Sequence, residues 1–497
     1  MRPLQYAAIA ATIFLAGCGG ATIPTDNVTD SNATPKIWPD YTGITMPPNI
    51  APLNFEISEP GHEYVTTVTG KNGQTLIADG KDVKWDIDEW HALLEANKGS
   101  ELEYAVFVKN DDGSWKRHKF INSVAREEID PFISYRLIEP SFNYSGAITI
   151  NQRNLTNFEE EPIFNNTFPF SGEDGFCMNC HVPRDYNRDH TSQFHVRLNH
   201  GGTMILRNGE AMKVNLKTDS TISAGVYPAW HPTLDLIAYS TNHTLQYFFQ
   251  RGSQKAEVLD TVSDLVLYDI EGNLLRNIAN DPEIMETFPA WSPDGKKIYY
   301  SAARYPAGIE RRNLSEKYDS VRYDILCRDF FPDSMTFGKP DTIVYASSRG
   351  RSALLPRISP DGKYLLFCEA HHGTFHIWHK DSDLFAKNLE TGEETALTEA
   401  NSNDVDSYHT WSSNGRWIVF SSRRDDGSYT RPYFTYFSEN GKASKAFILP
   451  QETADGHRTL MKSYNVPEFM VLPVNVPRRK LNEALMADPK NAVFSSK

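Results

Sequence analysis

One stretch of fourteen residues occurs four times between residues 227 and 421 of this 497-residue chain. The copies are Tyr227–Ser240, Phe288–Ser301, Leu355–Cys368 and Tyr408–Ser421. Each predicts a short strand, a tight turn and an apolar strand, and the last three turn at Asp-Gly or Asn-Gly, a strong hairpin signal. A unit this small cannot bury its apolar face by itself. The copies must therefore pack against one another, and they organise this part of the chain.

Further strand patterns accompany the copies. Asp264–Asn273 and Leu384–Glu393 have the pattern of a third strand followed by a turn. Met204–Leu216 has the same outer pattern without an inner pair before it, and Tyr464–Phe469 looks like a first strand without outer strands. Joining these two fragments would close a ring with strands from both ends of the repeat region. This interpretation predicts about five blades, with six as the alternative.

The four copies resemble the WD40-like repeat of TolB-type β-propellers. The resemblance covers residues from about 200 to about 470, and the first copy departs from it because Thr233-Leu234-Asp235 stands where the others carry the Gly turn. It implies a five- or six-bladed β-propeller, which we place at residues 201–472. It also implies a protein-binding role in the cell envelope.

Residues 177–181 read Cys-Met-Asn-Cys-His, the C-x-x-C-H arrangement of covalent c-type haem attachment. Cys177 and Cys180 would form the two thioethers, and His181 would be the proximal ligand of the iron. A zinc half-site and a thiol–disulfide pair are the alternatives. A zinc site needs more ligands, and Cys327 and Cys368 are distant and isolated in apolar runs. We therefore expect one covalently bound haem c.

Three residues downstream of the motif are candidates for the sixth iron ligand. His195 lies in a strand-like apolar pattern and is the favoured candidate. His200 precedes Gly201-Gly202, which permits close approach of the backbone. Met204 would give a higher redox potential. A five-coordinate iron is the alternative, and the sequence leaves this choice open.

The N-terminus predicts export and a lipid anchor. Arg2 follows Met1 as a short positive region, and an apolar stretch from Tyr6 to Ala16 ends in Leu15-Ala16-Gly17-Cys18. This resembles the bacterial lipoprotein signal over residues 1–18, with Cys18 as the lipidated first residue of the mature protein. Several acyl chains give stable anchoring. We expect an outer-membrane lipoprotein, on the periplasmic side in preference to the cell surface.

Aromatic residues make up 12% of the chain, and together with many Gly and Pro they favour a mainly β protein. Residues 37–140 predict an immunoglobulin-like β-sandwich with strands at Phe55–Ile57, Tyr64–Thr69 and Glu103–Val108. One helix interrupts them, with Asp88 as its predicted N-cap. A spacer and a sugar-binding module are the two alternatives for the role of this domain.

Three shorter segments complete the predicted organisation. Residues 19–36 are rich in Thr, Asn, Asp and Pro and predict a flexible linker. Residues 141–200 form a haem-binding segment that is short for an independent cytochrome domain. We therefore expect the haem to pack against one or both neighbouring domains. Residues 473–497 predict a polar tail.

Cationic and imidazole side chains recur in the loops that should gather at one mouth of the propeller. They are His243, Arg304, Arg349, Arg351, His371, His372, Arg423 and Arg424. They could receive an anionic partner or the haem propionates, but local pairing within each blade is the favoured interpretation. His371, His372, His376 and His379 also form a histidine cluster. A metal site there is the less favoured interpretation, because no nearby Cys completes it.

Two classes of function follow. The first is a membrane-anchored periplasmic electron-transfer protein whose propeller docks a redox partner. The alternative is a TolB-like envelope scaffold or translocation accessory in which haem is structural or sensory. A net charge of −14 argues against a nucleic-acid partner. The hydrolase motifs Gly-x-Ser-x-Gly and His-Glu-x-x-His do not occur, so a non-enzymatic carrier or binding protein is favoured.

Overall fold

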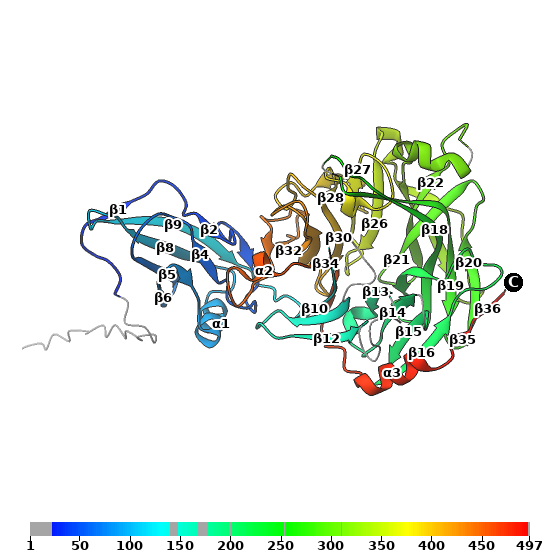
Figure 1. The fold of residues 1–497 in the computed structure, drawn as a ribbon, viewed down its shortest axis with the longest axis horizontal. Helices are drawn as coiled ribbons and strands as arrows, with labels where there is room; N and C mark the ends of the chain where they lie inside the picture. Colours follow the sequence, from blue (N-terminus) through cyan, green and yellow to red (C-terminus); the bar gives the residue numbers. More distant parts are fainter. Residues whose placement is uncertain are drawn as a thin grey trace, which may run out of the picture.

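The computed structural model describes residues 22–139, 148–166, 177–197, 200–252, 254–309 and 311–495. They form an elongated N-terminal domain beside a larger ring of β-sheets (Figure 1). The prediction of a mainly β protein with a propeller is confirmed. No described helix is long and apolar enough to cross a membrane.

The N-terminal domain contains two unequal sheets and one helix. The larger sheet has the order β1-β9-β8-β5-β6, with β3 on β9: β1 (Val28–Asp30), β3 (Thr45–Met46), β5 (Tyr64–Gly70), β6 (Thr75–Asp79), β8 (Glu101–Lys109) and β9 (Trp115–Val124). The smaller sheet consists of β2 (Ile37–Trp38), β4 (Phe55–Ile57) and β7 (Asp82–Val83). Both β1 and β3 pair with β9 in parallel. The domain therefore differs from the predicted immunoglobulin-like sandwich, which has two antiparallel sheets.

The N-cap of the helix in this domain lies two residues before the predicted one. α1 spans Ile87–Ala96, and the Asp86 carboxylate accepts hydrogen bonds from the backbone N–H groups of Asp88 and Glu89. Asp88 is thus a first-turn residue, where its charge complements the helix dipole. The predicted linker also differs, since β1 falls within residues 19–36 and belongs to the larger sheet.

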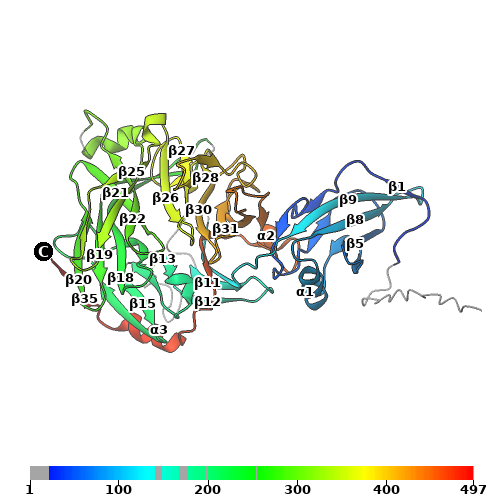
Figure 2. The same cartoon turned by 180° about the vertical axis from the view of Figure 1, so that it is seen from behind.

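Six antiparallel sheets form the blades of the ring, which we number 1 to 6 along the chain (Figures 1 and 2). Blade 1 contains β10 (Phe132–Ile138), β11 (Thr149–Asn154), β12 (Glu160–Asn165) and β34 (Ser463–Met470). Blade 2 contains β13 (Cys177–Pro183), β14 (Ser192–Arg197), β15 (Gly202–Arg207) and β16 (Glu210–Asn215). Blade 3 contains β17 (Val226–Trp230), β18 (Leu236–Phe248), β19 (Ala256–Asp269) and β20 (Leu274–Ala279).

The remaining blades follow the same plan. Blade 4 contains β21 (Ile284–Trp291), β22 (Lys297–Arg304), β23 (Asp324–Phe331), β24 (Thr336–Phe337) and β25 (Asp341–Val344). Blade 5 contains β26 (Ser352–Ile358), β27 (Tyr364–Ala370), β28 (Asp383–Asn388) and β29 (Glu394–Ala396). Blade 6 contains β30 (Asp406–Trp411), β31 (Trp417–Ser422), β32 (Arg431–Tyr436) and β33 (Phe447–Ile448), and the short helix α2 (Gly456–Thr459) precedes β34.

A strand from near the C-terminus closes the ring. β34 pairs with β10, and the innermost strands contact one another in the order β34, β13, β17, β21, β26, β30 and back to β34. The predicted fragment Met204–Leu216 does not complete the blade of Tyr464–Phe469. It supplies β15 and β16 of blade 2, whose inner strands are β13 and β14. The ring therefore has six blades and begins near residue 132, so it includes strands of the predicted segment 141–200.

The segment after residue 472 is folded along the outside of the ring. α3 (Arg478–Met486) packs against β16, and β35 (Lys490–Asn491) pairs with β16 in parallel. β36 (Val493–Phe494) then pairs with β20 of the next blade. This part of the chain is thus a strap over the outer edges of blades 2 and 3, where the sequence predicts only a polar tail (Figure 1).

The innermost strands share one backbone irregularity. Each contains a residue with φ between 46° and 59°, the left-handed region that non-glycine residues rarely adopt. These residues are Cys180, Tyr227, Phe288, Leu355, Tyr408 and Val466. The pairing register shifts at the same place in each blade, as in a β-bulge.

Indole groups join neighbouring blades three residues beyond this bulge. Each donates from its ring nitrogen to a backbone oxygen of the preceding inner strand: Trp230 to Val182 (3.2 Å), Trp291 to Ala229 (3.2 Å) and Trp411 to Arg357 (3.1 Å). All three indoles are buried. The repeated tryptophan therefore satisfies a buried carbonyl of the adjacent blade while it fills the space between the sheets.

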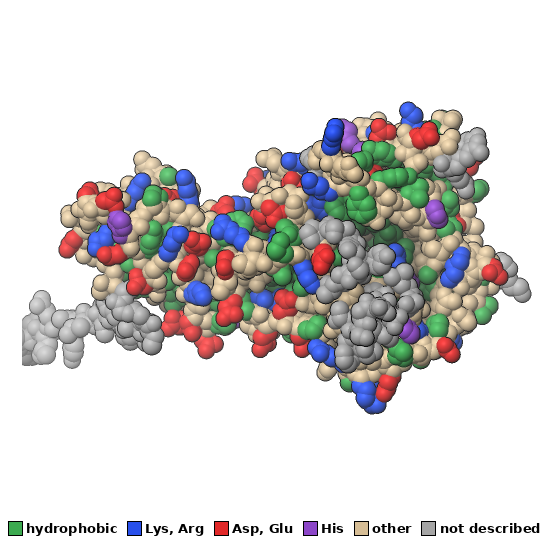
Figure 3. Space-filling model, viewed as in Figure 1, with side chains coloured by type: hydrophobic (Ala, Val, Ile, Leu, Met, Phe, Trp, Pro, Cys, Tyr) green, Lys and Arg blue, Asp and Glu red, His purple; other side chains and the backbone are tan. Residues whose placement is uncertain are grey.

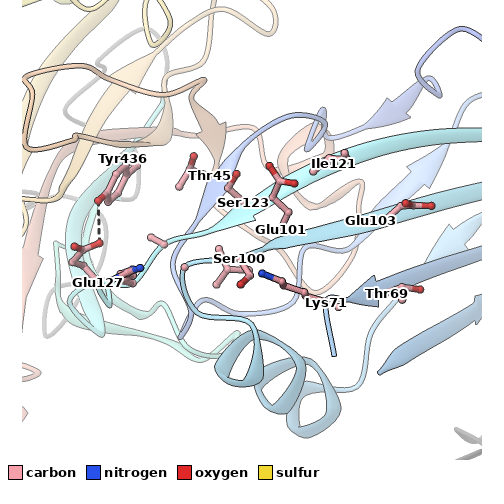
Figure 4. Close-up of a pocket in the computed structure, with 15 residues that line it drawn as sticks. Thr45, Thr69, Lys71, Ser100, Glu101, Glu103, Ile121, Ser123, Glu127 and Tyr436 are labelled. Atoms are coloured by element: carbon pink, nitrogen blue, oxygen red, sulfur yellow. Dashed lines mark hydrogen bonds between the residues drawn. The ribbon is translucent and has the colours of Figure 1, made fainter. Parts of the chain in front are cut away.

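The N-terminal domain is attached to blade 6. The Asp130 carboxylate accepts from the backbone N–H and the hydroxyl of Ser413, both at 2.6 Å. The Tyr436 hydroxyl donates to Glu127 at 3.0 Å beside a surface groove of about 970 Å³ between the domain and the blade (Figure 4).

Acidic and basic side chains are intermingled over the N-terminal domain in Figure 3. This face therefore carries no field of a single sign.

We predict that Trp411→Phe lowers the free energy of unfolding by about 1–3 kcal/mol, because the Arg357 carbonyl loses its buried donor. Urea denaturation followed by circular dichroism measures this change. Trp85→Phe is the matched control, since the Trp85 ring nitrogen is buried without a hydrogen-bond partner among the described residues. Equal losses in the two variants would show that lost ring volume, and not the hydrogen bond, determines the effect.

Acid should weaken the ring through His409. Burial lowers the pKa of His409 to about 3, so its ring is neutral in the folded protein. The unfolded chain binds a proton below about pH 6.5, and this part of the stability is therefore complete above pH 6.5 and lost as the pH falls. We expect His409→Gln to remove about 2 kcal/mol of the stability difference between pH 7 and pH 5. His243→Gln, at an exposed position, should leave that difference unchanged in urea titrations.

Candidate functional site

The C-x-x-C-H motif lies in the central channel of the propeller. Cys177, Cys180 and His181 are on β13, the innermost strand of blade 2, and all three line a channel cavity of about 300 Å³. A second cavity of about 440 Å³ lies toward the Ser-Pro-Asp-Gly turns. Arg357 and Glu468 line both cavities and form an ion pair of 2.7 Å. This pair divides the channel into two chambers.

The motif follows the repeat register of the other inner strands. Cys180 is the left-handed bulge residue of blade 2, equivalent to Tyr227 in blade 3 and Tyr408 in blade 6. Val182, two residues later, accepts the indole bond from Trp230, as Arg357 does from Trp411. The second cysteine thus replaces the aromatic or aliphatic side chain that the other blades place at the channel wall.

Both motif cysteines are free thiols, and both are partly buried. Burial raises the pKa of Cys180, while Arg197, the backbone of Tyr227 and Arg136 oppose this effect. The Cys180 thiol is therefore protonated at neutral pH unless it reacts or binds a metal.

His181 is a buried, neutral imidazole. Burial is the main cause that lowers its pKa to about 4, and the nearby Arg136 guanidinium lowers it further. Its Nε2 atom has no hydrogen-bond partner among the described residues. His409, one residue after the bulge of blade 6, instead bonds through Nε2 to the Leu355 carbonyl at 2.8 Å. The unsatisfied nitrogen of His181 is thus available as an acceptor or a metal ligand.

Aromatic and cationic groups complete the wall of this cavity. Tyr227, Phe288, Tyr408 and Trp378 supply aromatic surface, and Arg197 lies at the end of β14. Arg136 is buried on β10 and donates to the Met178 carbonyl (3.0 Å) and to Asn465 (3.1 Å). The cavity is therefore mostly apolar, with convergent thiol, imidazole and guanidinium groups, as ligand sites usually are.

The residues predicted as the sixth ligand lie elsewhere. His195 is buried on β14, and its Nδ1 atom is 3.2 Å from the Thr203 hydroxyl. His200 is in the turn before β15, and Met204 is fully buried in the apolar cluster between blades 1 and 2. None of the three is among the residues that line the cavity of the motif. Cys18 lies outside the described residues.

The residues of the channel fit a covalently attached haem c in their chemistry. Two free thiols and one imidazole line the same cavity, and the imidazole also has an unsatisfied buried nitrogen; these residue types are the donor set that haem attachment requires. The aromatic walls suit the face of an apolar ring, and Arg136 and Arg197 suit carboxylate groups, while the volume of about 300 Å³ admits only part of a haem.

The predicted arginines at the loop mouth pair mainly within their own blades. Arg349 and Arg351 both contact Glu369, and Arg424 contacts Asp406 at 2.8 Å. These ion pairs support the interpretation of local pairing. Arg423 differs, since it is buried with its guanidinium 4.2 Å from the centre of the Trp378 ring.

No family model matches this chain. The uncharacterized protein Atu1656 of Agrobacterium fabrum is 27% identical over 183 residues, which cover 33% of this chain and 59% of that protein. The match thus spans less than two thirds of the relative. Among solved structures, TolB from Acinetobacter baumannii has a TM-score of 0.42 at 14% identity, covering 77% of this chain and 85% of that one. A putative TolB from Agrobacterium tumefaciens has a TM-score of 0.38 at 14% identity, covering 69% and 99%.

Sequence reasoning missed several residues of the channel. Arg136 lies on a strand that the sequence places in the N-terminal domain, and Trp378 lies in a loop of blade 5. The repeat alignment contains a usable signal for two others, because Tyr227 and Tyr408 occupy the first position of their copies. Equivalent positions on inner strands meet at the channel, so the copies could have identified these wall residues.

Proposed function

We propose that this protein carries one haem c in its propeller channel and transfers electrons in the bacterial envelope. The observation that supports this most strongly is the convergence of Cys177, Cys180 and His181 on a single channel cavity. When bound, haem c supplies one-electron redox chemistry that no side chain provides.

Different residues of the channel would attach the haem, ligate its iron and surround it. The two thiols would hold the group on β13, and the Nε2 atom of His181, which has no hydrogen-bond partner among the described residues, would be the imidazole ligand of the iron. Arg136, buried in the wall, and Arg197, at the end of β14, would compensate the negative charge of the haem's carboxylate groups. The Arg357–Glu468 pair closes the inner end of the cavity, so access to the group would be through the opposite mouth.

A second candidate is an envelope scaffold that binds a protein partner through the propeller. Its supporting observation is the layout of a separate N-terminal domain followed by a six-bladed ring, a TolB-like arrangement. In that case the thiols and His181 serve a structural or sensory role. Envelope defects of a deletion strain that a Cys177→Ala/Cys180→Ala protein still repairs would favour this candidate, because they would not depend on haem.

The haem part of the proposal is tested by a pyridine haemochrome spectrum of the protein made in a host that matures c-type cytochromes. We expect a c-type band in the wild type and none in Cys177→Ala/Cys180→Ala. In the native reduced-minus-oxidised spectrum of the folded protein, His181→Ala should shift the haem bands, whereas His195→Ala should leave them unchanged because His195 does not line the cavity. Absence of haem from the wild type, despite working maturation, would leave the scaffold as the better proposal.

Lipidation of Cys18 would hold either kind of protein at the membrane. We expect Cys18→Ala to move the protein from the membrane fraction to the soluble fraction after cell lysis, because the acyl chains supply the binding energy. Immunoblots of the two fractions measure this, with an unrelated outer-membrane lipoprotein as the control. Retention of the variant in the membrane fraction would contradict the proposed anchor.

A further inference from the structure

A long hairpin of blade 3 crosses the mouth of the channel and meets blade 5. β18 and β19 extend well beyond their blade, and Thr244, Gln246 and Val258 of this extension line the cavity of the motif. Val258 and Ala256 also pack with Ile377 and Trp378 in the loop between β27 and β28. The hairpin is thus part of the wall of the channel, although it lies far from the Cys177–His181 motif along the chain.

Three metal-ligating side chains meet where the hairpin touches this loop. They are Glu257 on β19 and His372 and His379 in the loop of blade 5, and their ligand atoms all lie within 4.8 Å of one another. Glu257 Oε2 is 3.0 Å from His379 Nε2 and 3.7 Å from His372 Nε2. Two imidazoles and one carboxylate with an open position are a frequent ligand set of zinc and of other divalent transition metals.

The surroundings favour a bound ion over a simple ion pair. Glu257 is completely buried, and His379 is nearly so. Among the described residues, Glu257 Oε1 and His372 Nε2 have no hydrogen-bond partner, and unsatisfied buried polar atoms are costly. Gln254 donates to Glu257 Oε2 at 2.6 Å and orients the carboxylate, as outer partners of metal ligands do.

The backbone beside the cluster is fitted closely to it. Gly373 has a φ of 82°, and a Cβ atom there would lie 2.8 Å from His379 Cε1 and 3.1 Å from Glu257 Oε1. Any larger residue would therefore push the ligands apart. The sequence pattern shows the histidines but not the acidic ligand, which is 122 residues away from His379 along the chain.

We propose that Glu257, His372 and His379 bind one divalent transition-metal ion of the zinc class, which fastens the β18–β19 hairpin to blade 5 over the channel. The site is separate from the thiols of β13 and does not depend on the presence of haem. Its three ligands come from two blades, so metal binding joins elements that the sheets themselves do not connect.

Zinc titration of the chelator-treated full-length protein tests this site. We expect one tightly bound Zn²⁺ per chain, measured by elemental analysis after desalting and by competition with a chromophoric chelator. The same stoichiometry should hold in Cys177→Ala/Cys180→Ala, which removes competing thiols. Glu257→Gln and His372→Gln should each weaken binding by more than about 100-fold, since even outer partners of a metal contribute about 10- to 100-fold.

A control variant and a hydrogen-exchange measurement test whether these three residues bind the ion and whether the ion fastens the hairpin. His371→Gln is the matched control, because His371 is an exposed neighbour that contacts Asp381 and is not in the cluster. Amide hydrogen exchange of residues 244–248 and 256–260 should slow on addition of Zn²⁺ in the wild type and not in His372→Gln, whose partly exposed position makes misfolding less of a concern. No stoichiometric binding, or equal binding in His372→Gln and His371→Gln, would overturn the site. Binding without slower exchange would overturn the fastening role.

Discussion

Hydrogen bonds between neighbouring inner strands hold this propeller in register. An indole of one blade donates to a carbonyl two residues beyond the left-handed bulge of the preceding blade, at three of the junctions. Because a bulge leaves a strand locally unpaired, its backbone needs partners outside its own sheet. The bulge places one residue per blade at the channel, and the indole bond supports it at these three junctions. The candidate site follows from this geometry, since Cys180 occupies the bulge of blade 2.

Burial then determines the chemistry of the channel. The same absence of water that raises the pKa of Cys180 lowers that of His181, and both groups are consequently neutral in the folded protein. The His181 imidazole is thus in the form that binds a metal, whereas the Cys180 thiol must lose its proton when it reacts or binds one. Among the charged residues of the channel, Arg357 and Glu468 form an ion pair, whereas Arg136 donates to the Met178 carbonyl and to Asn465.

The repeats made most of the ring predictable, because each contains both strands of a hairpin and its turn within fourteen residues. Thus β21–β22 and β26–β27 lie within or next to the predicted copies. Prediction was poorer where a blade lacks the repeat. Blade 1 pairs β34 with β10, which lies more than 300 residues earlier in the chain. Blade 2 begins with the cysteine motif, and its residue types match haem attachment instead of the fourteen-residue repeat. The sequence predicts Asp88 as the helix cap, whereas the Asp86 carboxylate accepts the first hydrogen bonds; both are aspartates, so residue type alone does not distinguish them.

The sequence by itself determined the β class, the repeated hairpins and the donor set Cys177, Cys180 and His181, since these depend on residue types at short spacing. Tertiary structure alone decided the number of blades, the strap after residue 472 and the meeting of Glu257 with His372 and His379. The physical reason is that strand pairing and side-chain contact act through space between residues hundreds of positions apart. Such contacts leave no period in the local sequence, so only the closed ring shows which distant residues share a site.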